Sequence, residues 1–204
     1  MRVNDISKVK PAKDNIVVKT IEPNRNDKLF ITKADQPDTK NTLLSFGEVI
    51  AIGPNATQNE YCPELKLSDT VTYSSFAGSH IATENIKELY KIMGGYSVMA
   101  KIDDINNLNW DTVHPTSNRI LVEVKFVDQT QEGLFISEDE AKDPRLEDLD
   151  YGVIVSTGPS CKLGYKVGDT VAYQPYAGEN IRPPQSVDRP ALRVLIEEDI
   201  LLTI

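Results

Sequence analysis

The sequence contains little cysteine or histidine and no long apolar segment. Its 204 residues include two of each, which are Cys62, Cys161, His80 and His114. These are too few for a disulfide framework or for most metal sites. No segment approaches the roughly 20 apolar residues that cross a bilayer, and residues 1–14 lack the composition of a targeting peptide. We therefore expect a soluble protein of a reducing compartment that stays where it is made, with no metal or other cofactor and no membrane partner.

Basic residues are scarce relative to acidic ones. The chain has 22 Lys and Arg residues against 31 Asp and Glu residues, which gives a formal net charge of −9. This charge repels the phosphate backbone of nucleic acid at long range. The remaining composition is that of a globular protein, since 40% of the residues are hydrophobic and 26% are charged. Nucleic acid is therefore not an expected partner.

What the sequence does contain is an internal repeat. Five blocks of the first half return in the same order in the second half, at offsets of 104, 105 or 100 residues. The pairs are Pro11–Val18 with Pro115–Val122, Leu29–Ile31 with Leu134–Ile136, Gly47–Pro54 with Gly152–Pro159, Lys66–Tyr73 with Lys166–Tyr173, and Phe76–Gly78 with Tyr176–Gly178. Such ordered matches indicate a duplicated domain. We predict a first domain at residues 1–103, a linker at 104–112 and a second domain at 113–204.

The apolar segments within each half are short and rich in β-branched residues, and turn residues separate them. This pattern predicts β-strands. They are expected at residues 16–21, 47–52 and 70–73 and at 120–127, 152–156 and 170–173, and each half ends on an apolar segment, at 96–102 and 198–204. Several short strands in a domain of this size are typical of a small barrel or sandwich. The predicted fold class is therefore all-β, with two tandem small irregular β-barrels.

Two long loops, at residues 22–45 and 128–151, interrupt the predicted strands. Connections longer than about 12 to 15 residues in compact domains are usually functional or disordered. The first loop has no net charge, whereas the second has seven net negative charges. Each nevertheless contains the tripeptide Leu-Phe-Ile. Its residues are Leu29, Phe30 and Ile31 in the first loop and Leu134, Phe135 and Ile136 in the second.

Three consecutive large apolar side chains are unfavourable in water unless something covers them. One interpretation is that the tripeptide forms a core strand folded back on its own barrel. The other is a mobile arm that becomes ordered when its tip enters an apolar groove on a partner. The second interpretation is favoured, because the tripeptides are identical although the loops around them differ in charge.

The ordered set of blocks resembles the GroES-type co-chaperonins, which cap the ring-shaped chaperonin that folds proteins using ATP. The resemblance covers nearly the whole chain, as two successive copies. Its elements are the prolines Pro11 and Pro115, the two tripeptides, the strands that begin at Gly47 and Gly152, Lys66–Val71 and Lys166–Val171, the Ala-Gly turns at 77 and 177, and the closing segment Glu198–Leu201. Each element is weak by itself, but the set is specific.

The resemblance implies a protein that binds and does not catalyse. The two tripeptides would contact the apical domain of a GroEL-type chaperonin in its nucleotide-bound state, so that a substrate protein is enclosed. The family places Gly before the tripeptide. The second loop keeps this residue as Gly133, whereas the first has Asp27 and Lys28. We therefore do not expect the two loops to bind with the same geometry.

The family also forms homo-oligomeric rings, in which the closing strand of one barrel pairs with the opening strand of the next. The residues that this contact implies are Val98, Met99, Ile200 and Leu201 on the closing strands and Ile16, Val18, Ile120 and Val122 on the opening strands. The alternative is that these side chains belong to the core of their own barrel.

Tandem copies in one chain resemble the plastid-type double co-chaperonin. A co-chaperonin encoded by a bacterium or a phage is an equally good interpretation. The expected location is thus the cytoplasm of a bacterial or phage-infected cell, or the plastid stroma for a mature chain. A structural or assembly protein built from tandem barrels remains an alternative function. A zinc-dependent dehydrogenase, which uses a related barrel, is disfavoured because the sequence has neither a Gly-rich dinucleotide turn nor cysteines and histidines at ligand spacing.

Overall fold

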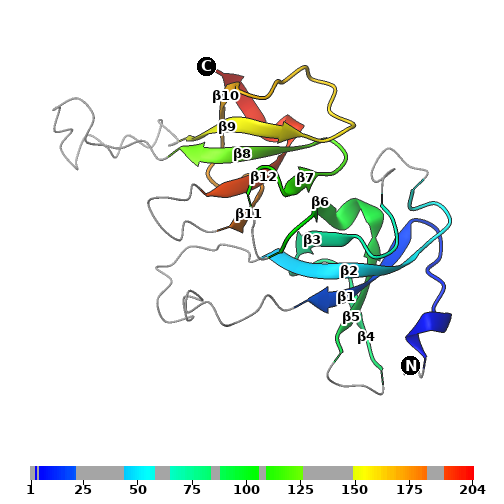
Figure 1. Ribbon diagram of the computed structural model, residues 1–204. Helices are drawn as coiled ribbons and strands as arrows, with labels where there is room; N and C mark the ends of the chain where they lie inside the picture. Colours follow the sequence, from blue (N-terminus) through cyan, green and yellow to red (C-terminus); the bar gives the residue numbers. More distant parts are fainter. Residues whose placement is uncertain are drawn as a thin grey trace, which may run out of the picture.

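The structure is a computed structural model that describes residues 3, 5–21, 44–57, 65–83, 88–105, 109–125, 149–182 and 191–204. Its strands form two antiparallel sheets that lie one above the other in Figure 1. The first sheet has the order β4-β5-β1-β2-β3-β6-β7 and the second the order β11-β12-β8-β9-β10-β13. The prediction of an all-β fold with two tandem small β domains is confirmed.

The strands have short spans, and three single 3-10 turns accompany them. The first sheet contains β1 (Asn15–Ile21), β2 (Leu44–Ile52), β3 (Thr70–Ser74), β4 (Ser79–Ile81), β5 (Tyr90–Gly94), β6 (Val98–Ile102) and β7 (Val113–Pro115). The second contains β8 (Arg119–Lys125), β9 (Asp150–Thr157), β10 (Thr170–Tyr173), β11 (Glu179–Arg182), β12 (Leu192–Ile196) and β13 (Ile200–Thr203). The 3-10 turns are η1 (Ile6–Lys8), η2 (Gly95–Ser97) and η3 (Glu197–Asp199).

All six predicted strands occur, but the sequence reading missed five others among the described residues, including the short strand β7. Those are β4, β5 and β7 in the first sheet and β11 and β12 in the second. The two closing segments were also predicted to start too early, because η2 and η3 precede β6 and β13. For the predicted strand at 120–127, residues 126 and 127 lie outside the described residues.

We call β1–β6 the first unit and β8–β13 the second unit, because their strands correspond one to one. Both units have the same strand order, and two of the β-bulges also coincide. A bulge in the β1–β2 ladder lies between Val17 and Val18, and one in the β8–β9 ladder lies between Leu121 and Val122. Bulges are local features that a fold retains for a reason. Their coincidence shows that the sequence repeat is a repeat of the fold.

Equivalent residues fill the two cores. Inward-facing side chains of the strands are almost fully buried in each unit, as expected for sheets with one face packed. The first core contains Ile16, Val18, Val49, Val71, Tyr73, Met93 and Val98, and the second contains Ile120, Val122, Ile154, Val171, Tyr173, Leu195 and Ile200 at the matching positions.

The turn that follows β3, and its counterpart after β10, requires glycine. Gly78 has a φ of +70° and Gly178 a φ of +66°, and a side chain is strained in this region. A Cβ atom at these positions would also collide with the backbone oxygens of Ile92 and Val194 respectively. The repeated Ala-Gly pair is thus explained by the fold itself.

Candidate functional site

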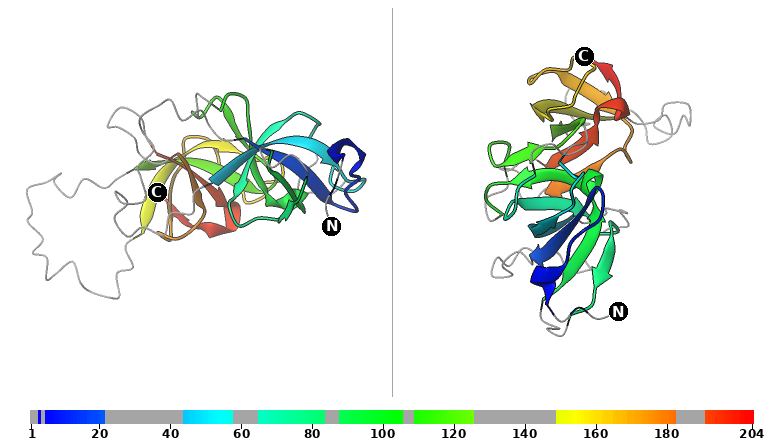
Figure 2. Two further views of the ribbon diagram at one scale, coloured as in Figure 1. Left: turned by 90° about the horizontal axis from the view of Figure 1, so that it is seen from below. Right: turned by 90° about the vertical axis from the view of Figure 1, so that its right-hand side faces the viewer.

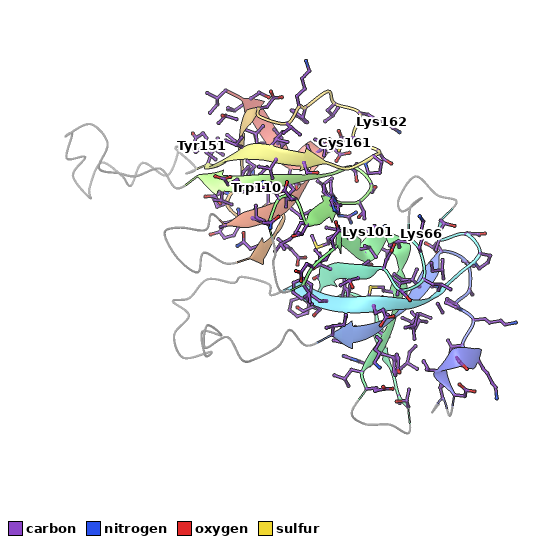
Figure 3. All side chains as sticks on the ribbon, viewed as in Figure 1. Lys66, Lys101, Trp110, Tyr151, Cys161 and Lys162 are labelled. Atoms are coloured by element: carbon purple, nitrogen blue, oxygen red, sulfur yellow. The ribbon has the colours of Figure 1, made fainter. Side chains whose placement is uncertain are left out.

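The two Leu-Phe-Ile tripeptides lie outside the described residues, but the structure describes the strands on either side of them. Residues 22–43 connect β1 to its neighbour β2. The residue pair of the β1–β2 ladder next to this loop is Ile21 with Phe46. Residues 126–149 connect β8 to its neighbour β9, and the residue pair of the β8–β9 ladder next to this loop is Lys125 with Tyr151. Tyr151 is labelled in Figure 3, near the start of β9. Both loops therefore leave their unit at the same place in the repeat.

A buried tyrosine fixes the base of each loop. The Tyr73 hydroxyl lies 3.3 Å from the Thr20 hydroxyl and donates to the carbonyl oxygen of Phe46 at 3.4 Å. In the second unit the Tyr173 hydroxyl donates to the carbonyl oxygen of Tyr151 at 3.4 Å. Burial raises the pKa of Tyr73 and raises the pKa of Tyr173 to about 12. Both phenols thus stay protonated and can donate these bonds at neutral pH.

A cation lies over each of these tyrosine rings and holds the neighbouring turn. Lys91 Nζ is 5.5 Å from the centre of the Tyr73 ring and donates to the carbonyl oxygens of Ser75 and Ala77, at 2.8 and 3.2 Å. Burial lowers the pKa of Lys91. The distance favours a cation–π interaction.

Arg193 has the same role in the second unit. Its guanidinium carbon is 5.5 Å from the centre of the Tyr173 ring, and Nη1 donates to the Pro175 carbonyl oxygen at 3.2 Å and to Asp150 at 2.7 Å. The turns held in this way carry the most exposed aromatic side chains among the described residues, Phe76 at 81% and Tyr176 at 91%.

The second feature is the place where the two units meet, which we call the internal junction. Strand β7, which lies just before the second unit, pairs with the closing strand β6 of the first unit, as Figure 1 also shows. The pairs are Ala100 with Pro115, Lys101 with His114, and Ile102 with Val113. A backbone ladder therefore continues the first sheet with residues from the other half of the chain.

An apolar cluster covers this ladder. It contains side chains from both units, and most are almost fully buried. They are Phe46, Ala100 and Ile102 from the first unit, Val113 from β7, and Leu121, Ile181, Leu192 and Val194 from the second unit. Burial of this apolar area is the main favourable contribution to the contact between the units.

Side-chain hydrogen bonds add to the junction. The buried hydroxyl of Thr116 donates to the carbonyl oxygen of Val98 at 2.7 Å. Arg119 Nη2 donates to the carbonyl oxygen of Tyr96 at 2.6 Å. At the rim, His114 Nε2 lies 2.8 Å from an Asp103 carboxylate oxygen.

Glu179, at the start of β11, also reaches the first unit. Burial raises its pKa, whereas a hydrogen bond with Ser74 and the positive charge of Arg119 act in the opposite direction. Sequence reasoning missed Thr116, Arg119 and Glu179. The positions where the two copies differ, such as Ala12 against Thr116, could have drawn attention to them.

The predicted ring-contact residues divide into two groups. Six pack in the cores: Ile16, Val18 and Val98 in the first unit and Ile120, Val122 and Ile200 in the second. Met99 packs against the cluster of the internal junction, and Leu201 is 52% exposed. That these residues contact a neighbouring chain stays a prediction.

Within the chain, the closing strand β6 does meet the start of the second half. Its partner is Val113–Pro115, which differs from the Ile120 and Val122 that the resemblance implied. The reason is that both edges of β8 are already paired, with β9 and with β12. The side chains of Ile120 and Val122 pack in the core of the second unit.

Among the described strands, none pairs with the outer edge of the closing strand of the second unit. Strand β13 corresponds to β6, but it is the last strand of its sheet. Leu202 and Ile204 occupy the positions of Ala100 and Ile102, and they are 44% and 71% exposed where their counterparts are buried. The surface that β7 and the second unit cover on β6 is thus uncovered on β13.

The described residues show no arrangement typical of a catalytic or metal centre. In this part of the chain, no group of three or more potential metal-ligating side chains comes together. Figure 3 labels Cys161 near the end of β9 that is opposite to Tyr151. Burial is the main reason that the pKa of Cys161 is raised to about 11. A thiol with this pKa is a poor nucleophile at neutral pH. None of the described helices is long and apolar enough to span a membrane.

Comparison with known proteins agrees with the repeated fold. The family described as "Chaperonin 10 Kd subunit" matches the chain twice, at residues 8–102 and 112–204. The chain belongs to this chaperonin 10 family. It is a GroES-type co-chaperonin in two-domain form, and the two matches correspond to its two units.

Relatives of this chaperonin 10 protein include both tandem and single forms. The "20 kDa chaperonin, chloroplastic" of Spinacia oleracea is 27% identical over 199 residues, which cover 91% of this chain and 72% of the relative. The protein of the same name from Arabidopsis thaliana is 24% identical over 196 residues, with the same coverage. The "Co-chaperonin GroES" of Natranaerobius thermophilus is 32% identical over 98 residues, which cover 47% of this chain and 98% of the relative.

Proposed function

We propose that this protein caps a GroEL-type chaperonin ring in its nucleotide-bound state and encloses substrate protein there. Contact is made by the tripeptides Leu29–Ile31 and Leu134–Ile136. The observation that carries the proposal is that both copies retain Leu-Phe-Ile in a loop between the same two strands, although the charges around it differ. In the described strands, the core side chains of both units are almost fully buried.

The magnitudes fit attachment through several arms. Burial of Leu, Phe and Ile at roughly 1.5 to 3 kcal/mol each would contribute about 5 to 9 kcal/mol. Ordering of the loop would cost about 2 to 5 kcal/mol of this gain. One arm therefore binds weakly. Several arms on one rigid platform act together through their effective concentration, which gives tight but reversible attachment.

The platform would be a homo-oligomeric ring. The internal junction supplies the pattern: β13 of one chain would pair with residues 9–11 of the next, as β6 pairs with β7 inside the chain. The exposed Leu202 and Ile204 support this proposal, because contact with a second copy would cover them. Residues 9–11 and β13 lie at opposite ends of the molecule in all the views (Figures 1 and 2). Contact between them is therefore head to tail, which forms a ring if the rotation closes.

The mechanism is selective binding without catalysis. Nucleotide switches the chaperonin to a state with accessible grooves, and the arms stabilise that state because they bind it preferentially. The protein would act wherever its chaperonin is present. Relatives named as chloroplastic favour the plastid stroma, and bacterial relatives named GroES favour the bacterial cytoplasm.

The proposal is tested by mixing the full chain with a GroEL-type chaperonin and measuring co-migration in size-exclusion chromatography with ATP, with ADP and without nucleotide. We expect retention only with nucleotide. Co-migration that does not depend on nucleotide, or the absence of co-migration under all three conditions, would contradict the proposal and favour a structural role. In that case the exposed edge of β13 would serve another assembly.

A further inference from the structure

The segment before each unit's first core strand has the same backbone conformation in both units. Lys13 and Ser117 have positive φ values of 56° and 59°. The backbone N–H of Asn15 donates to Ala12 O at 3.1 Å, and that of Arg119 donates to Thr116 O at 3.2 Å.

Two more backbone bonds repeat in these segments. Gly53 N donates to Asn15 O at 2.8 Å, and Gly158 N donates to Arg119 O at 2.7 Å. Asn55 N donates to Lys13 O and Ser160 N donates to Ser117 O, both at 2.9 Å. Residues 12–15 are therefore already shaped like residues 116–119.

The side chains on these two equivalent backbones differ at the positions that serve the internal junction. Thr116 donates its hydroxyl to Val98 O, but Ala12 has no hydroxyl to donate. Arg119 reaches Tyr96 O, but Asn15 is shorter and turns its amide back to Ala12 O at 2.9 Å.

The difference extends to position 13. Ser117 is 2% exposed, whereas its counterpart Lys13 is exposed and charged. A lysine placed where a serine is buried loses hydration.

From these differences we infer that a junction between two chains is weaker than the junction inside one chain, and that residues 12, 13 and 15 set its strength. This rests on the ring proposed above, and the occupant of the β13 edge is a second copy of this chain. The apolar residues of β13 supply the attraction, while the side-chain donors found inside the chain are missing. An assembly of this protein thus opens and closes at chain boundaries and leaves each pair of units intact.

The test introduces the internal donors into the first unit. In Ala12→Thr the new hydroxyl can reach Ile200 O of the neighbouring chain, the counterpart of Val98 O. We expect this variant to lower the chain-to-chain dissociation constant about fivefold, since a buried hydrogen bond contributes about 1 kcal/mol. The double variant Ala12→Thr/Asn15→Arg should lower it about 30-fold or more, because the guanidinium adds a charge-assisted bond. Sedimentation velocity and native mass spectrometry over a dilution series measure both values.

Two controls isolate the hydrogen bonds. Ala12→Val adds nearly the same volume as threonine without a hydroxyl, and we expect its dissociation constant to remain within about twofold of the parent. Thr116→Ala/Arg119→Asn removes the donors from the internal junction. It should leave the chain-to-chain dissociation constant unchanged while lowering the thermal unfolding temperature.

The outcomes separate this inference from the proposed function. If the parent chain assembles and the Ala12→Thr and Ala12→Thr/Asn15→Arg variants have the same dissociation constant as the parent, the inference is wrong, whereas the ring proposal is unaffected. Equal tightening by Ala12→Val and Ala12→Thr would also contradict it. If no variant or parent assembles at any concentration, the ring proposal fails together with the inference, whereas the chaperonin-binding test above judges the tripeptides independently.

Discussion

The first and second units use equivalent residues at nearly every core position, yet the segments in front of them have diverged. Ile16 and Ile120 are both fully buried on equivalent strands. By contrast, Ala12 is exposed, whereas its counterpart Thr116 is buried against the first unit. The two copies thus share the residues that form the core of each unit and differ in the residues that contact another unit. Leu-Phe-Ile is shared as well, although the two loops that contain it differ in charge.

The largest expected effect comes from breaking one core at a time. Ile16→Ala and Ile120→Ala should each lower the free energy of unfolding by about 2 to 5 kcal/mol, because each leaves a cavity in a packed core. The internal junction couples the units through a shared apolar cluster. We therefore expect one common thermal transition that shifts by a similar amount in both variants, measured by calorimetry.

A different result would separate the units. If calorimetry showed two transitions, with Ile16→Ala shifting only one and Ile120→Ala only the other, the units would unfold independently. The internal junction would then be a contact without cooperativity.

A smaller effect should distinguish the two buried tyrosines at high pH. The pKa of Tyr173 is raised to about 12 in the folded state, so the folded protein keeps a proton that the unfolded chain releases near pH 10. Its contribution to stability is complete below pH 10 and is lost as the pH rises to about 12, which amounts to about 2 to 3 kcal/mol.

The measurement is the free energy of unfolding by urea between pH 9 and pH 12. Tyr173→Phe should flatten the alkaline loss of stability relative to the parent, and Tyr73→Phe should flatten it less. Identical dependence of the unfolding free energy on pH in the two variants would contradict the structure, in which the surroundings of the two tyrosine rings differ.

The sequence predicted the repeat and the strands β1, β2, β3, β8, β9 and β10, because these depend on local apolar patterning and on turn residues. It missed β4 and β7 because a strand of three residues shows no alternation. It missed β11 because its sequence, Glu-Asn-Ile-Arg, contains one apolar residue. It missed β5 and β12 because each contains a cation, Lys91 or Arg193, in the middle of an apolar segment. The structure explains both cations, since each lies over a tyrosine ring and bonds to the turn beside it.

The internal junction could not be predicted from pattern alone. Its cluster combines Phe46 with Leu121 and Val194, which are far apart in sequence and lie on different strands. The polar bonds of Thr116 and Arg119 depend on backbone oxygens, which leave no mark in the sequence. The tripeptides, in contrast, were identified from the sequence alone, because an identical apolar segment in two dissimilar loops needs no structure to be noticed.

The most direct test of the central claim replaces both tripeptides, Leu29–Ile31 and Leu134–Ile136, with Ser-Ser-Ser. Nucleotide-dependent binding to the chaperonin is then measured by surface plasmon resonance beside sedimentation velocity. A matched control carries Leu67→Ser, Leu163→Ser and Val167→Ser, which remove three exposed apolar side chains outside the loops. We predict loss of binding by at least about 100-fold in the tripeptide variant, with its oligomeric mass and the binding of the control unchanged. Unaltered binding, or loss of folding and assembly in the tripeptide variant, would contradict the account, because the tripeptides would then be part of the core.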